Sequence, residues 1–230
     1  MFRRLAHYSP FMHSVTTTLV RRVAAVLLGL GVVPVACAQM IPGYPDSVEA
    51  YDPREVAMLP AYCRHTQAFR AAVAGGSDPA EIAKWRGVFG EPYEHMHHYC
   101  WGLMKTNRAS VLARSEQART FYLSDSIHEF DYIIARVPKD FVLLPEMLTK
   151  KGENLIRLGQ GPSGMLELEH AAQVKPDYWP AYAFMSDFYK DLGEIGKARD
   201  ALERGLGAAP DSPALKRRLA ELKSAKGTRR

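Results

Sequence analysis

The residues best suited to chemistry form a short block, residues 95–102, which reads His-Met-His-His-Tyr-Cys-Trp-Gly. Imidazole and thiolate groups are ligands that zinc and other transition metals prefer. On a helix the first and third histidines of the block share a face, whereas the middle one does not. The Cys-x-x-Cys spacing of many zinc sites is absent. One hypothesis is therefore a metal or haem site that uses His65, His95 and His98, together with Cys63 and Cys100.

The same two cysteines suit a different role. If residues 1–38 are a signal peptide that is removed on export, Cys63 and Cys100 are the only cysteines left. An even number in an oxidising compartment favours one disulfide bond. The bond would close a loop of about 38 residues and stabilise the fold by about 3–4 kcal/mol. We expect this disulfide without a metal or other cofactor, and the alternatives are the metal site and a histidine-lined partner surface.

Two other patterns carry little chemistry. Residues 159–164 spell the GxGxxG of dinucleotide sites, but such a site needs a preceding strand, and no strand pattern occurs in this chain. Asp125 and His128 lie one helical turn apart and could belong to a Ser-His-Asp arrangement. However, no serine of the sequence lies in a known nucleophile motif. We interpret this pair as a helix start and a surface histidine. The sequence therefore predicts a protein without catalytic activity.

The N-terminal segment predicts the compartment. Two arginines precede an apolar run, residues 23–35, which is shorter than the about 20 residues that span a bilayer. Residues 36–38 read Ala-Cys-Ala, the small-x-small pattern of a signal-peptidase site. We expect residues 1–38 to be a signal peptide, with Gln39 as the first residue of a periplasmic protein that has no membrane span. An uncleaved anchor and a lipoprotein acylated at Cys37 are the alternatives.

Composition and charge narrow the class of protein. Of 230 residues, 47% are hydrophobic and 24% charged, which is typical of a globular protein and not of a disordered or multi-pass membrane chain. The formal net charge is +5. Four of the 30 basic side chains and none of the 25 acidic ones lie in residues 1–38, so the rest carries 26 against 25, a net charge of +1. This balance argues against nucleic acid as a partner.

A repeat of period 34 predicts the elements that position these residues. Shifting the chain by 34 residues superimposes Gly152 on Ser186, Leu155 on Tyr189, Gly159 on Gly193, Gly164 on Ala198, Leu168 on Leu202, Ala171 on Gly205 and Pro176 on Pro210. Small residues meet small ones and large apolar residues meet large ones. The pattern resembles the tetratricopeptide repeat (TPR). The resemblance implies an all-α fold, a solenoid of helical hairpins in which small residues sit where paired helices come closest.

The resemblance covers about three repeats, of which the first is degenerate. Its first helix is expected within residues 109–123 and its second within residues 126–138. In the middle unit, Lys151 occupies a position that should be apolar. Upstream, helices are expected over residues 53–73 and 79–88. The predicted order is signal peptide 1–38, extended lead-in 39–52, helical His/Cys region 53–106, repeats 107–211, and a capping helix with a basic tail 212–230.

In TPR proteins the inward-facing residues of each first helix line a concave groove that holds a peptide or a partner helix. The residues of this sequence at the corresponding positions carry both positive and negative charges. Such a mixed surface suits a specific protein partner better than nucleic acid. The resemblance thus implies a non-catalytic periplasmic adaptor or scaffold. A metal- or haem-handling protein is the alternative function, and ordinary solvated charges are the alternative interpretation of the groove. The groove residues are Arg108, Ser115 and Arg119 in the first unit, Glu146, Lys150, Glu153 and Arg157 in the second, and Phe184, Asp187, Lys190 and Asp191 in the third.

Overall fold

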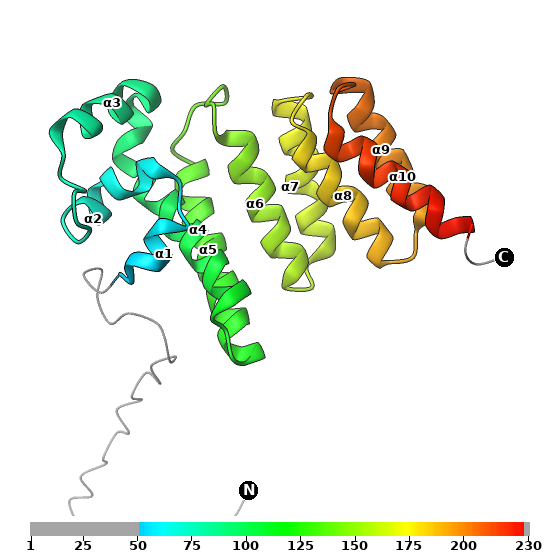
Figure 1. Cartoon of the computed structure of the whole chain (residues 1–230), viewed down its shortest axis with the longest axis horizontal. Coiled ribbons are helices and arrows are strands. Elements are labelled where there is room, and N and C mark those ends of the chain that lie inside the picture. Colours follow the sequence, from blue (N-terminus) through cyan, green and yellow to red (C-terminus); the bar gives the residue numbers. More distant parts are fainter. Residues whose placement is uncertain (1–50, 228–230) are drawn as a thin grey trace, which may run out of the picture. The chain divides into compact units, whose positions relative to one another are not determined.

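The computed structural model describes residues 51–227, and this part of the chain folds into helices without a β-strand (Figure 1). The helices pack as sequential antiparallel pairs, as an all-α fold requires. No helix of the described part is both long and apolar enough to cross a membrane. The predicted signal peptide, with its cleavage site, and residues 39–50 of the lead-in lie outside the described residues.

Two consecutive pairs follow the 34-residue period. The first pair is α6 (Leu144–Arg157) with α7 (Gly161–Val174), and the second is α8 (Trp179–Asp191) with α9 (Ile195–Ala208). The turn within each pair contains a glycine with positive φ, 78° at Gly159 and 76° at Gly193. Glycine adopts this conformation without steric cost, so it ends a helix readily. The two turn glycines are one period apart, which is why the pairs match.

The first helices of successive pairs form one layer. Helix α4 (Met96–Val111) contacts α6, α6 contacts α8, and α8 contacts the final helix, α10 (Pro213–Gly227). In Figure 1, α6 to α9 run alternately up and down. The second helix of each pair packs against the first helix of the next pair. Side chains of different repeats therefore meet along a single face.

The helix pair of the first, degenerate repeat differs from our prediction. It consists of α4 and α5 (Glu116–Ile134), so the helix expected within residues 109–123 does not exist. The side chain of Ser115 accepts a hydrogen bond of 3.1 Å from the backbone N–H of Ala118, and this N-cap starts a new helix at residue 116. The boundary expected between residues 106 and 107 falls inside α4. The expected helix start at Asp125 is also wrong, because Asp125 lies in the middle of α5.

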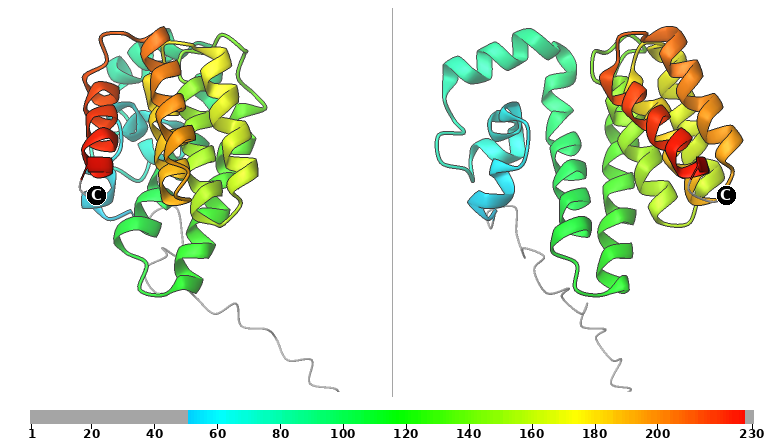
Figure 2. Two further views of the ribbon diagram at one scale, coloured as in Figure 1. Left: turned by 90° about the vertical axis from the view of Figure 1, so that its right-hand side faces the viewer. Right: turned by 45° about the vertical axis from the view of Figure 1, so that its right-hand side comes forward.

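The N-terminal region packs on α4 as short pieces (Figure 2). The helix expected over residues 53–73 is broken at Pro60, which lacks the N–H that a continuous helix needs. A helix does form where residues 79–88 predicted one, and Asp78 caps it by accepting from the backbone N–H of Ala80 at 2.8 Å. The pieces are α1 (Pro53–Ala57), the 3₁₀ turn η1 (Ala61–His65), α2 (Gln67–Arg70), α3 (Pro79–Phe89) and the 3₁₀ turn η2 (Glu91–His95).

The predicted disulfide bond is present. It joins Cys63 of η1 to Cys100 of α4, with their Cα atoms 5.6 Å apart, and both residues are fully buried. Aromatic side chains surround it in the core, among them Phe69, Tyr93 and Tyr99. This bond and the aromatic core fix the short N-terminal helices to α4.

Lys151 occupies a position of the repeat that was expected to be apolar, and its contacts show why a lysine is accommodated there. Its Nζ lies 2.7 Å from a carboxylate oxygen of Asp131 in α5 and 2.7 Å from one of Glu167 in α7. Burial lowers the pKa of Lys151, but the hydrogen bonds to these two carboxylates outweigh it and the pKa is raised. The lysine thus stays charged and links three consecutive helices.

Candidate functional site

Charged side chains, together with the ring of Phe184, form a continuous row over the layer of first helices. On α6 they recur every three or four residues, so they share one helical face, and the same spacing is found on α8. They are half-buried or exposed, in contrast to the buried residues between them. We call this set the polar row: Glu146, Lys150, Glu153, Arg157, Phe184, Asp187, Lys190 and Arg218.

Contacts between neighbouring helices make the row continuous. The Nζ of Lys150 lies 5.8 Å from the ring centroid of Phe184, which joins α6 to α8. An ion pair of 3.4 Å between Asp187 and Arg218 joins α8 to α10. On the other side, Arg157 donates a hydrogen bond of 2.9 Å to the hydroxyl of Ser110 in α4. The structure therefore brings predicted groove residues from different repeats onto one surface.

Most charges of the row pair with a neighbour on their own helix. Glu153 accepts from Lys150 at 3.2 Å and lies 4.0 Å from Arg157, while Asp187 lies 3.4 Å from Lys190. Solvent-accessible pairs of this kind contribute about 0–1 kcal/mol, so a partner can replace them at little cost. The row offers alternating charge without a strong net sign.

Glu146 is held more firmly than the other acids of the row. The fully buried Tyr99 of α4 donates a hydrogen bond of 2.6 Å to its Oε1. Burial, and then the charge of Glu146, raise the pKa of Tyr99 well above its usual range, and both also raise the pKa of Tyr62 and Tyr178. The hydrogen bond from Tyr99 thus holds this carboxylate against α4.

Arg108 does not belong to the row, and its prediction as a groove residue is wrong. The side chain is 2% exposed and forms a bidentate ion pair with Glu55 of α1, at 2.5 and 2.7 Å. The error follows from the helix that was misplaced in the first repeat, because Arg108 lies on α4 and faces the N-terminal region.

The remaining predicted groove residues, Ser115, Arg119 and Asp191, lie at the start of α5 or at the end of α8. Arg119 is exposed on α5 and lies 3.8 Å from Glu116. Burial lowers the pKa of the Arg157 guanidinium; Glu153 opposes this effect, and the charge of Arg119 adds to it. Ser115 is used as the N-cap of α5, and Asp191 is the exposed last residue of α8.

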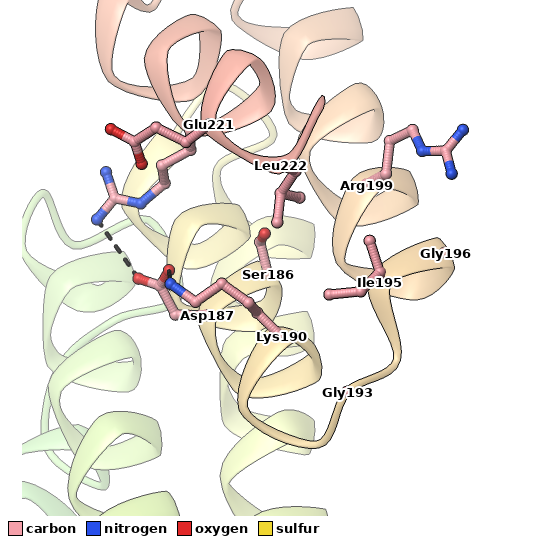
Figure 3. A pocket seen from close by; sticks show the side chains of 10 residues that line it. Ser186, Asp187, Lys190, Gly193, Ile195, Gly196, Arg199, Glu221 and Leu222 are labelled. Carbon is pink, nitrogen blue, oxygen red and sulfur yellow. Dashed lines mark hydrogen bonds and ion pairs between the residues drawn. The ribbon is translucent and has the colours of Figure 1, made fainter. Parts of the chain in front are cut away.

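A cavity of about 580 Å³ opens beside the row, where α10 diverges from the α8–α9 turn (Figure 3). Asp187, Lys190 and Arg218 belong both to its lining and to the row. The sequence pattern of residues 212–230 predicts a capping helix and gives no direct sign of the cavity. The apolar stripe of that helix, which includes Leu222, was the available signal. The remaining lining residues are Ser186, Gly193, Ile195, Gly196, Arg199, Glu221 and Leu222.

The histidines proposed as metal ligands each have a different environment. The Nδ1 of the buried His65 lies 2.9 Å from the carbonyl oxygen of Gly76. The Nδ1 of His98 lies 2.6 Å from Glu129, and its ring stacks on Tyr132. His95 meets the edge of that tyrosine, with ring centroids 5.9 Å apart.

The structure therefore does not assemble the proposed ligand set. In residues 51–227, no three His, Cys, Asp or Glu side chains come together in a way that would hold a metal ion. The two cysteines are bonded to each other, so they have no thiolate to offer a metal. The middle histidine, His97, has its pKa lowered to about 4, mainly by burial and then by the neighbouring His98.

The glycines of the GxGxxG pattern serve packing. Gly159 forms the turn between α6 and α7. A Cβ at Gly161 would lie 2.7 Å from the ring of Phe188 in α8, and one at Gly164 would lie 2.6 Å from the carbonyl oxygen of Gly152 in α6. A helix, not a strand, precedes the pattern, whereas a dinucleotide site of this motif follows a strand.

Comparison with known proteins does not place the chain in a family. No family model matches it, and no curated protein matches it significantly.

Proposed function

We propose that the chain is a periplasmic adaptor of the TPR kind, which binds another protein or peptide along the polar row and has no catalytic role. The observation that carries this proposal is the continuity of the row over α4, α6, α8 and α10, through Arg157–Ser110, Lys150–Phe184 and Asp187–Arg218. A surface that crosses successive repeats can contact an extended segment at several points. Its mixed charges favour a partner with a matching charge pattern.

The TPR assignment is supported by the residues that set helix contacts. The period of 34 places turn glycines at 159 and 193 and small residues where the paired helices approach. In the second pair, Ser186 and Ala198 take the positions of Gly152 and Gly164, and they are 2% and 0% exposed. Such stacked hairpins commonly present one face to a binding partner.

The compartment is supported by the disulfide and by the N-terminal sequence. A fully buried Cys63–Cys100 bond is typical of proteins that fold in an oxidising environment. Residues 23–38 carry the apolar run and the Ala-x-Ala pattern of a cleavable signal. Both features favour export into a bacterial periplasm.

The experiment compares two charge reversals in the full-length, C-terminally tagged chain produced in the source organism. Lys150→Glu changes the middle of the polar row, whereas Lys139→Glu changes an exposed lysine in the loop between α5 and α6. Proteins that copurify with the wild type and with the Lys139 variant, but not with the Lys150 variant, support the proposal. Equal copurification by both variants contradicts it, provided that circular dichroism shows both to be folded.

A further inference from the structure

The cavity next to α10 combines an apolar interior with charged groups at its mouth. Ser186 of α8, Ile195 of α9 and Leu222 of α10 point toward the same space in Figure 3. Its volume of about 580 Å³ lies within the range of about 300–1,000 Å³ that is usual for ligand sites. The space can accept an apolar side chain, because Ile195 and Leu222 flank it and the small Ser186 forms its floor.

Positive charge exceeds negative charge around this cavity. Lys190 and Arg218 share one carboxylate, that of Asp187, at 3.4 Å each. Arg199 makes no ion pair with another residue of the described range, and Figure 3 shows its side chain extending outward from the space between the helices. The second acid of the lining, Glu221, lies 3.9 Å from Arg217, which is outside the cavity. Three cations therefore face two carboxylates in the lining, so an acidic group at the mouth would meet an excess of positive charge.

A glycine borders the cavity on the α9 side. Gly196 belongs to the lining, and a Cβ added there would meet nothing within 4 Å. Its backbone has no positive φ, so a larger residue fits the helix. This position permits the cavity to be filled without straining the fold.

We propose that the cavity is the anchor site of the protein partner, and that it takes a peptide segment in which an aliphatic residue is followed by an acidic one. The aliphatic side chain enters between Ile195 and Leu222, and the carboxylate is attracted by the excess positive charge around the cavity, to which Arg199 contributes. The inference rests on the proposed function, because Asp187, Lys190 and Arg218 connect the cavity to the polar row.

The test measures binding of two fluorescein-labelled peptides by fluorescence anisotropy. One has the sequence Gly-Ser-Leu-Asp-Leu-Asp-Gly-Ser, and in the other both Asp residues are replaced by Asn. Four proteins are compared: wild type, Gly196→Leu, Arg199→Glu and Gly207→Leu. Gly207 is the matched control, because it is an exposed glycine on the same helix whose Cβ also meets nothing within 4 Å and which does not line the cavity.

We expect the acidic peptide to bind the wild type about tenfold more tightly than the Asn peptide, a difference of about 1.4 kcal/mol. Gly196→Leu and Arg199→Glu should each weaken its binding about tenfold, and Gly207→Leu should leave it unchanged. Equal affinity for both peptides, no measurable binding, or full binding by Gly196→Leu overturns the inference. If one of these results is found but Lys150→Glu still abolishes copurification of the partner, the proposed function stands and only the anchor site is refuted. If Lys150→Glu also has no effect on copurification, both proposals fail.

Discussion

The Cα of Gly164 in α7 lies so close to the backbone of α6 that a Cβ at this position would be 2.6 Å from the carbonyl oxygen of Gly152. The reverse contact is equally close, since a Cβ at Gly152 would lie 2.8 Å from the carbonyl oxygen of Gly164. Two glycines therefore set the distance between the helices of this pair. Helix α6 carries half of the polar row. This contact therefore also affects where that half lies relative to the residues of the row on α8.

We predict that Gly164→Ala destabilises the protein. The added methyl group must displace backbone, which costs about 1–3 kcal/mol in a packed interior. Gly207→Ala is the control: its Cβ meets nothing, and alanine is favoured over glycine in a helix by roughly 0.5–1 kcal/mol. Urea denaturation of both variants measures the difference. A Gly164 variant as stable as the Gly207 variant would show that α6 and α7 do not approach as described.

The Cys63–Cys100 bond should supply a large part of the stability of the N-terminal region. Replacing both cysteines with alanine is expected to lower the free energy of unfolding by about 3–4 kcal/mol, because the unfolded chain regains the freedom of a closed loop. Denaturation of the wild type with and without reductant gives an independent measurement. Thiol titration of the denatured, unreduced wild type should find no reactive thiol at these positions, and two reactive thiols would refute the bond.

His97 should make stability depend on pH. Burial lowers its pKa to about 4, so the folded protein keeps the ring neutral, while the unfolded chain protonates it below about pH 6.5. The free energy of unfolding is therefore unaffected by this histidine above pH 6.5. As the pH falls from 6.5 toward 4, protonation of the unfolded chain lowers it by roughly 2–3 kcal/mol. His97→Gln should flatten the stability profile over this interval, whereas His128→Gln, at an exposed histidine of α5, should not. Identical profiles for wild type and His97→Gln would disprove the assignment.

Arg108 should behave as a structural residue and not as a binding residue. Its loss leaves the buried carboxylate of Glu55 without its bidentate partner, and breaking a buried ion pair of this kind costs about 3–5 kcal/mol. Arg108→Met should therefore unfold at much lower urea concentration, and adding Glu55→Met should recover part of the loss. If Arg108→Met keeps its stability but loses the partner, our placement of this arginine is wrong.

The repeat pairs were predictable because their signals are local. Gly159 and Gly193 provide turns at a fixed period, and the small residues at 164 and 198 mark close helix contacts. The disulfide was predictable for a similar reason, since only two cysteines follow residue 38. In each case a residue type has few structural roles, so its position is informative.

The features that escaped prediction depend on distant residues. Arg108 is buried only because Glu55, from another helix, pairs with it, and no spacing in the sequence connects the two. Lys151 is polar at an apolar position because Asp131 and Glu167 surround it from neighbouring helices. The break at Pro60 is different, because proline is a local signal that is visible in the sequence. The helical pattern of residues 53–73 predicts one continuous helix only if this proline is ignored.

The most direct test of partner binding along the polar row is site-specific photocrosslinking in cells of the source organism. A photoreactive phenylalanine analogue replaces Lys150 on the row or, as a control, the exposed Glu203 on α9. We predict that irradiation links a distinct protein to position 150 and not to position 203. The absence of an adduct at position 150, or the same adducts at both positions, would contradict a partner that binds along the polar row.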